Sequence, residues 1–179
     1  MKVSATPLVG ALELQPEFFA DDRGFFMEAW NHKRYSQAGI PQPFKQANFS
    51  ESARGVLRGL HYHRHQADIW VVAAGQPFIA LVDVRPAVSG TGAPVVETID
   101  AVPGDAFYLP AGVAHGFYAR EPITLVYLVT NEYDGNDELG FAWDDPDAAV
   151  AWPDPEPIIS PRDADAPSLA QLIAELRTD

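Results

Sequence analysis

The segment from Arg58 to Asp68 concentrates side chains that can do acid–base or metal chemistry. It holds three of the five histidines of the chain, together with two arginines and one carboxylate. Imidazole titrates near neutral pH, so a histidine can take a proton from a substrate or, when neutral, bind a metal ion. Because side chains alternate along a β-strand, His61 and His63 are predicted to point into the same cavity.

The elements that position this segment are predicted to be short strands. Sixteen prolines and thirteen glycines separate apolar runs, which is typical of an all-β sandwich or barrel. Gly75-Gln76-Pro77 indicates a hairpin. A short helix is expected over residues 31–38 and an amphipathic helix over 168–177. Strands are expected over residues 12–14, 25–30, 44–50, 56–63, 69–74, 78–84, 95–99, 106–109, 113–118 and 123–130.

The composition limits the class of protein. With 179 residues, of which 47% are hydrophobic, we expect one domain over 1–179, with its core over about 8–168. The absence of cysteine excludes disulfides and thiolate metal sites. A net charge of -13 argues against a nucleic-acid partner, and no apolar run is long enough to cross a membrane. We therefore expect a cytoplasmic protein that holds anionic ligands with a few placed arginines.

Seven motifs stand in order along the chain and indicate one family. They are Phe-Ala-Asp-Asp-Arg-Gly-Phe-Phe-Met-Glu (19–28), Gln-Ala-Asn-Phe-Ser (46–50), Gly-Val-Leu-Arg-Gly-Leu-His-Tyr (55–62), Val-Asp-Val-Arg (82–85), Leu-Pro-Ala-Gly-Val-Ala-His-Gly-Phe (109–117), Tyr127 with Tyr133, and Trp-Pro (152–153) with Ile-Ser-Pro-Arg-Asp (159–163). From about residue 8 to 168 the chain resembles the dTDP-4-dehydrorhamnose 3,5-epimerase family of the cupin superfamily.

The resemblance implies a cupin jelly-roll β-barrel, a homodimer, and epimerisation of a dTDP-4-keto-6-deoxy sugar at C3, C5 or both, without a cofactor. It assigns His61 as the base, Asp163 as its orienting partner and Tyr127 as the proton donor on the opposite face. An imidazole held by a carboxylate suits this work. The positions that match the family's substrate contacts are Arg23, Glu28, Gln46, Asn48, Arg58, His115, Tyr133, Glu138 and Arg162.

One position departs from the family pattern. The family has Gln-(Ala/Gly)-Lys after the histidine, and the resemblance implies that this lysine neutralises the enolate. Here the matching stretch is Gln66-Ala67-Asp68. A carboxylate beside a developing enolate raises its energy. Single epimerisation, isomerisation of a ketosugar and loss of activity therefore stay open beside double epimerisation. Asp68 as an ion-pair partner of Arg64, with no chemistry, is a further alternative.

The same region also resembles the metal-binding pattern of other cupins. His61, His63, Asp68 and His115 stand at the spacing of its ligands, with aspartate in place of glutamate. Three imidazoles and a carboxylate suit a divalent transition metal. A metal-dependent cupin enzyme and a non-catalytic nucleotide-sugar binder are thus the alternatives to a metal-free epimerase.

Overall fold

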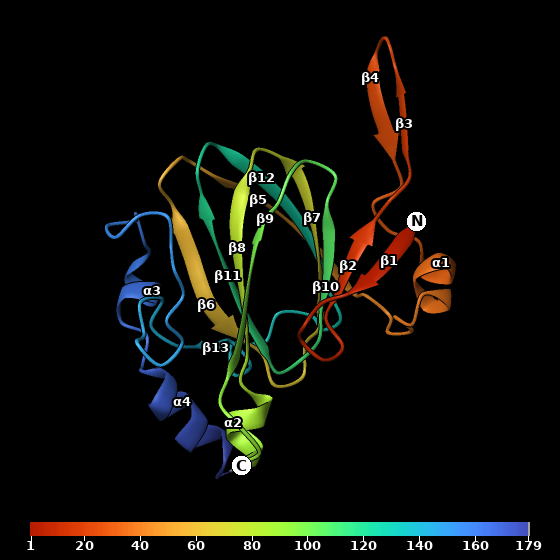
Figure 1. Ribbon diagram of the computed structural model, residues 1–179. Helices are drawn as coiled ribbons and strands as arrows, with labels where there is room; N and C mark the ends of the chain where they lie inside the picture. The colour runs from red at the N-terminus through yellow and green to blue at the C-terminus, as the bar shows by residue number, and fades with distance from the viewer. Residues whose placement is uncertain (179) are drawn as a thin grey trace.

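The computed structural model describes residues 1–178, which form two antiparallel sheets that face each other (Figure 1). The six-stranded sheet has the order β1 (Lys2–Ala5), β2 (Leu12–Gln15), β10 (Ala106–Leu109), β7 (Asp68–Ala74), β12 (Ile123–Val129) and β5 (Gln46–Ser52). The five-stranded sheet has the order β13 (Leu139–Gly140), β6 (Leu57–Tyr62), β11 (Val113–Ala119), β8 (Pro77–Asp83) and β9 (Val95–Asp100). The predicted all-β fold is confirmed.

The apolar core fills the space between the two sheets. Along β8, Ile79 and Leu81 point inward, where they pack with Trp70, Phe107 and other side chains of both sheets. This follows from the two-residue alternation of a strand. All seven residues of β8 are buried, because the outer face of this strand is covered as well. Its sequence therefore reads as one continuous apolar run.

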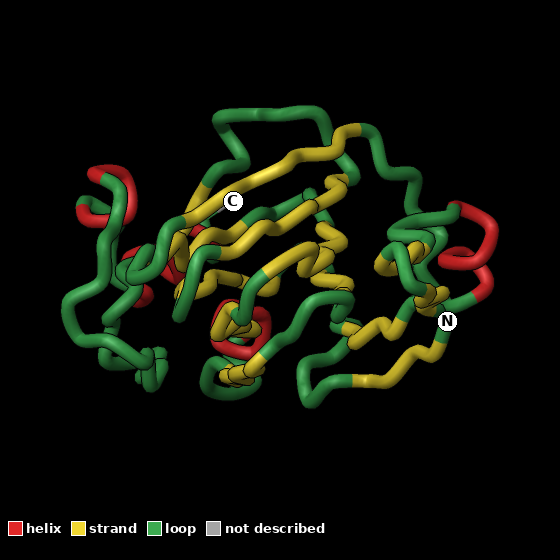
Figure 2. Tube along the Cα trace, turned by 90° about the horizontal axis from the view of Figure 1, so that it is seen from above, coloured by secondary structure: helices red, strands yellow, loops and turns green. Residues whose placement is uncertain are grey.

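Helices and loops cover the outer faces (Figure 2). Helix α4 (Leu169–Leu176) packs Leu169 and Leu172 on the outside of the five-stranded sheet. It starts with a capping box between Ser168 and Gln171, and the predicted C-terminal helix is confirmed. Helix α1 (His32–Gln37), capped by Asn31, lies beside the six-stranded sheet and packs Tyr35 there. The short helices α2 (Arg85–Ser89) and α3 (Pro161–Ala164) were not predicted.

The predicted hairpin at Gly75-Gln76-Pro77 is wrong. Strand β7 belongs to the six-stranded sheet and β8 to the five-stranded sheet, so the chain crosses from one sheet to the other at Gly75. Gly75 has φ +77°, and a Cβ there would lie 2.4 Å from the carbonyl oxygen of Pro122. A glycine that permits a tight crossover and a glycine that permits a hairpin look the same in a sequence.

Strands β3 (Phe18–Asp21) and β4 (Gly24–Met27) form an arm that projects from the rest of the molecule (Figure 1). The strand predicted over 25–30 therefore ends at Met27, where the chain leaves the arm and turns toward α1.

Among residues 1–178, no helix has both the length and the apolar character needed to cross a membrane.

Candidate active site

A cavity of about 340 Å³ opens between the two sheets, and both sheets contribute polar side chains to it. Nine of the twelve predicted catalytic and substrate-binding residues line it directly. They are Gln46, Asn48, Arg58, His61, His115, Tyr127, Tyr133, Glu138 and Arg162. His63 lines the same cavity as His61, as the strand alternation predicts. Of the remaining three, Asp163 contacts His61 at the edge of the cavity, whereas Arg23 and Glu28 lie away from it.

One wall of the cavity is produced by the register of β5, β12 and β7. Cross-strand partners share a face of a sheet, so their inward side chains align in rows. The rows are Gln46 with Val129 and Asp68, Asn48 with Tyr127 and Trp70, and Ser50 with Leu125. Tyr127 and Asp68 are thereby fixed on neighbouring strands of the same wall.

The opposite wall depends on a β-bulge in β6. Strand β11 pairs His115 with His61 and Phe117 with Arg58, so β6 advances three residues where β11 advances two. Side chains three residues apart in a regular strand point to opposite faces, and the extra residue brings both Arg58 and His61 to the cavity. Gly59 lies in the bulge with φ +127°, and a Cβ there would lie 2.6 Å from Cα of Gly116.

His61 and Asp163 form a hydrogen-bonded pair at the edge of the cavity. Nε2 of His61 lies 2.9 Å from Oδ1 of Asp163, which is buried on α3. A carboxylate only accepts, so His61 carries its proton on Nε2 and keeps the lone pair on Nδ1. Burial alone raises the pKa of Asp163, but hydrogen bonds from His61, Ser160 and the Gly59 amide together hold that pKa below its usual value. Asp163 therefore stays ionised.

Tyr127 is half-buried on the wall opposite His61. Burial and the negative charges of Asp68 and Glu138 raise the pKa of Tyr127 above its ordinary value of 10.0, against a smaller opposing effect of Arg58. The phenol thus stays protonated at neutral pH. His61 on β6 and Tyr127 on β12 therefore come from different sheets and face the cavity from opposite walls.

Two arginines offer cationic groups to the cavity. Arg58 donates from Nε to the hydroxyl of Ser52 at 3.0 Å, which fixes its direction. Arg162 donates to a carboxylate oxygen of Glu138 at 3.1 Å and to the carbonyl of Glu138 at 3.2 Å. Guanidinium groups bind diphosphate oxygens in pairs, so these two side chains can hold an anionic substrate in a protein of strongly negative net charge.

Deeper in the cavity, His63, Asp68 and His115 form a buried cluster. Burial raises the pKa of Asp68, although His63 and hydrogen bonds from Gln66 and Trp70 oppose this. Burial lowers the pKa of His115 well below its usual value, and the charges of His63 and His61 add to the effect. His61 is not part of this group, because it pairs with Asp163, so the four-residue metal set is reduced to three.

Asp68 and Arg64, both described in the structure, do not form the ion pair considered above, because Arg64 donates to Glu175 at 2.8 Å.

Two other residues contribute to the site without having been predicted from the sequence. Trp70 lines the cavity and donates from its indole N–H to Asp68 at 3.2 Å. Asp137 accepts three backbone N–H groups of residues 64–66 and so fixes the loop after His63. The contact between Asp137 and this loop leaves no signal in the sequence, because Asp137 lies 71 to 73 positions further along the chain.

Arg23 and Glu28 do not reach the cavity of their own chain. Arg23 lies at the tip of the β3–β4 arm and pairs with Asp21. Glu28 follows the arm and binds Arg34 at 3.2 Å. Both are predicted substrate contacts, and within one chain they lie away from the cavity because the arm points away from the sheets (Figure 1).

The chain is similar to enzymes of one family over nearly its whole length. The family model for dTDP-4-dehydrorhamnose 3,5-epimerase matches residues 5–171. The chain is 36% identical to the dTDP-4-dehydrorhamnose 3,5-epimerase of Pseudomonas aeruginosa, over 95% of this chain and 97% of the relative. It is 37% identical to the dTDP-4-dehydrorhamnose 3-epimerase of Streptomyces niveus, over 96% and 85%. The structure of dTDP-6-deoxy-D-glucose-3,5-epimerase from Legionella pneumophila, solved with dTDP-4-keto-L-rhamnose, superposes with a TM-score of 0.87 at 35% identity, covering 98% of this chain and 96% of that one.

Proposed function

The chain belongs to the dTDP-4-dehydrorhamnose 3,5-epimerase family and is an epimerase of dTDP-4-keto-6-deoxy sugars, and we propose that it inverts C3, C5 or both with His61, Asp163 and Tyr127. The observation that supports this most is the position of the acid and the base. His61 lies on β6 and Tyr127 on β12, on opposite walls of one cavity. Inversion requires a proton to leave from one face of the ring and return to the other.

In this proposal, Nδ1 of His61 removes the proton on the carbon next to the C4 ketone. Asp163 holds the imidazole by its Nε2–H at 2.9 Å and stabilises the imidazolium that forms. The electron pair moves to the ketone oxygen and gives an enolate. The phenol of Tyr127, whose raised pKa keeps it protonated, then returns a proton to carbon from the opposite face.

Arg58 and Arg162 would bind the diphosphate of the dTDP group. Both line the cavity, and both are partly exposed, so an incoming anion can reach them. Arg162 must then exchange some of its contacts with Glu138 for the substrate. The sugar ring would extend from there toward His61, which lines the same cavity. Gln46, Asn48 and Tyr133 lie along the facing edge and would contact the sugar or the base.

We further propose that Asp68 takes the position of the family's lysine and makes the enolate harder to form. Asp68 is buried in the cavity wall one row from Tyr127, with no ion pair to a lysine or arginine among residues 1–178. A negative charge there opposes a second one on the ketone oxygen. This favours a reaction at one carbon, as in a 3-epimerase, unless another cation is bound beside Asp68.

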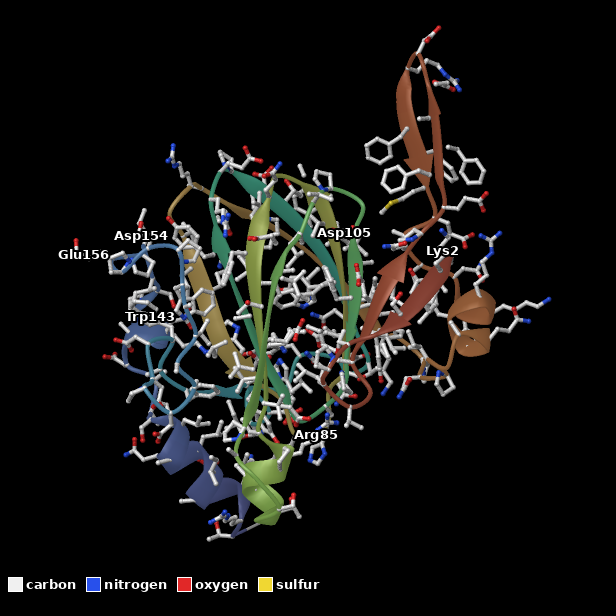
Figure 3. All side chains as sticks on the ribbon, in the orientation of Figure 1. Lys2, Arg85, Asp105, Trp143, Asp154 and Glu156 are labelled. Atoms are coloured by element: carbon white, nitrogen blue, oxygen red, sulfur yellow. The ribbon has the colours of Figure 1, made fainter. Side chains whose placement is uncertain are left out.

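We also propose that the protein is a homodimer that associates through the β3–β4 arm. Phe18, Phe19, Phe25 and Phe26 are 42% to 68% exposed on the arm, and aromatic rings stand on both of its sides (Figure 3). A two-stranded ribbon with apolar side chains on both faces is only marginally stable in water. A second copy would cover these rings, and its arm would bring Arg23 to a neighbouring cavity.

Exchange of solvent deuterium into the substrate tests the chemistry. The protein is incubated in D₂O with dTDP-4-keto-6-deoxyglucose, and the proton signals at C3 and C5 are followed by NMR. We expect loss of the C3 signal, the C5 signal or both, and no loss with His61→Asn. His65→Asn is the control, because this exposed histidine, in the loop after β6, does not line the cavity. Absence of exchange at both carbons with the unaltered protein would contradict the proposal for this sugar.

A further inference from the structure

The cluster of His63, Asp68 and His115 places three donor atoms within 4.8 Å of one another at the inner end of the cavity. The side chains are 3% to 6% exposed, so water does not freely solvate them. His115 turns its Nε2 toward Oδ2 of Asp68 at 3.8 Å, and the rings of His63 and His115 lie 5.5 Å apart. The epimerisation described above uses none of these three groups for proton transfer.

Hydrogen bonds on the far side of each imidazole fix its protonation. Nδ1 of His63 lies 2.7 Å from the carbonyl oxygen of Asp137, and Nδ1 of His115 lies 3.2 Å from that of Val113. A carbonyl oxygen only accepts, so each ring donates from Nδ1, and when the ring is neutral its lone pair is on Nε2. In that state the free nitrogen of each ring and the carboxylate of Asp68 are all acceptors.

We propose that His63, Asp68 and His115 bind a divalent transition-metal ion. Three acceptors gathered in a buried site repel one another until a cation lies between them. Imidazoles that donate their other N–H to a backbone carbonyl are the usual arrangement around a protein-bound metal. Two imidazoles and one carboxylate suit Fe²⁺, Mn²⁺, Ni²⁺ or Zn²⁺.

Binding an ion requires the three ligand atoms, which lie within 4.8 Å of one another, to move closer together. Bonds of about 2.0–2.2 Å put neighbouring ligand atoms of a tetrahedral site roughly 3.4 Å apart. The 3.8 Å between His115 and Asp68 is slightly wider than this. Asp68 is already oriented, because it accepts from Gln66 at 2.9 Å and from the indole of Trp70 at 3.2 Å. His63 is held by the loop that Asp137 fixes.

The inference rests on the proposed function for its consequence, but not for the site itself. Asp68 stands where the family pattern has a lysine, and a bound divalent ion would restore positive charge to that wall. The residues at positions 63 and 68 both differ from the epimerase pattern, and both His63 and Asp68 have side chains that can bind a metal ion. One change therefore explains both substitutions: a bound cation supplies the positive charge that the lysine supplies in the family pattern.

Metal titration of the purified protein tests the site. After chelation and removal of the chelator, Co²⁺ is added and its visible absorption is followed. Zn²⁺ is then used as competitor, and elemental analysis gives the stoichiometry. We expect one ion per chain, and at least a hundredfold loss of affinity in both His63→Gln and Asp68→Asn. His65→Gln, in the same loop but exposed, should bind as the unaltered protein does.

Two further readouts make the result decisive. Zn²⁺ should raise the melting temperature of the unaltered protein and of His65→Gln, but not of His63→Gln. This requires no activity, and circular dichroism confirms that each variant is folded. Absence of stoichiometric binding by the unaltered protein, or equal affinity in His63→Gln, Asp68→Asn and His65→Gln, would overturn the inference.

The deuterium-exchange experiment separates this inference from the proposed function. Exchange at C3 or C5 by protein that binds no metal would leave the epimerase proposal intact and remove the metal site. Stoichiometric metal binding without exchange would do the reverse.

Discussion

In the proposed mechanism, the pair of His61 and Asp163 determines how readily His61 removes the proton. Asp163 has a lowered pKa and accepts the Nε2 proton of His61, so it fixes the tautomer and stabilises the charged ring. Asp163→Asn keeps the size of the side chain but removes its charge. We expect the rate of deuterium exchange to fall by about 10²- to 10⁴-fold, with the substrate affinity little changed. Initial rates of exchange by NMR measure this.

Asp165→Asn is the matched control for that change. Asp165 is exposed at the end of the same short helix and does not line the main cavity. It should exchange at the normal rate. An Asp163→Asn enzyme as fast as the control would show that His61 needs no carboxylate partner.

Tyr127 should be needed for inversion more than for proton removal. Tyr127→Phe keeps the ring in the cavity wall but removes the hydroxyl, so His61 can still remove a proton and return it to the same face. We expect exchange with solvent to exceed epimer formation by about tenfold or more, while the unaltered enzyme keeps the two rates comparable. NMR of exchange together with chromatography of the epimers gives both rates. Equal loss of the two rates would assign Tyr127 another role.

The raised pKa of Tyr127 predicts the alkaline side of the pH profile. Its phenol ionises above its ordinary value of 10.0, because it is half-buried and faces Asp68 and Glu138. The phenol of Tyr127, the proposed proton donor, therefore keeps its proton as pH rises through 10 and loses it only at higher pH. We expect the ratio of epimer formation to exchange to stay constant up to pH 10. A fall of this ratio between pH 8 and 9 would contradict the geometry.

At the scale of elements, the bulge in β6 is what places Arg58 and His61 in one cavity. Gly59→Ala adds a Cβ that would lie 2.6 Å from Cα of Gly116, at φ +127°. We expect a loss of roughly 3 kcal/mol or more in the free energy of unfolding, because a positive φ alone costs about 1–3 kcal/mol and the clash adds to it. Urea denaturation measures the loss.

Gly24→Ala separates the clash from the backbone strain. Gly24 has nearly the same φ, +124°, but a Cβ there would meet no atom within 4 Å. It should cost only the strain. If both variants lose the same stability, the close approach of β6 and β11 does not constrain this position.

The sequence predicted long elements well and short ones poorly. Strands β7, β8 and β12 have seven residues each and are mostly apolar, so each is recognisable in the sequence as an apolar run. Strand β13 has two residues and β1 is exposed throughout, so neither has an apolar pattern to recognise. The crossover at Gly75 was taken for a hairpin, since no local signal tells which sheet the next strand joins.

The site shows the same division between local and long-range information. Motifs located the residues that line the cavity, and alternation placed His61 and His63 together. The bulge that brings Arg58 to the same wall depends on how β6 packs against β11, and Asp137 acts on a loop 71 to 73 positions away. Asp68 could be identified as unusual from the sequence, but its convergence with His63 and His115 is visible only when three strands and a loop are assembled.

At the scale of the whole molecule, the arm is the least self-sufficient part of the fold. Phe19 and Phe26 pair across one face of the ribbon with ring centroids 6.3 Å apart, and Phe18 and Phe25 stack on the other face at 4.9 Å. The base of the arm is anchored where Phe18 packs against Gly104 and Met27 packs against the core beside the six-stranded sheet. Covering these rings stabilises by about 25 cal/mol per Å² of apolar surface, which favours association of two copies.

Replacing both Phe19 and Phe26 with aspartate should therefore convert a dimer into a monomer. Each side chain is more than half exposed, so the change leaves the two sheets intact but puts charges in the interface. Light scattering after gel filtration should show the mass fall by half. Because Arg23 lies on the same arm, we expect KM for the dTDP sugar to rise about tenfold or more while exchange at saturation continues. Val9→Asp, at an exposed apolar residue off the arm, is the control and should remain dimeric with normal KM. A monomeric unaltered protein at micromolar concentration, or a double variant that stays dimeric, would show that the arm does not hold two copies together.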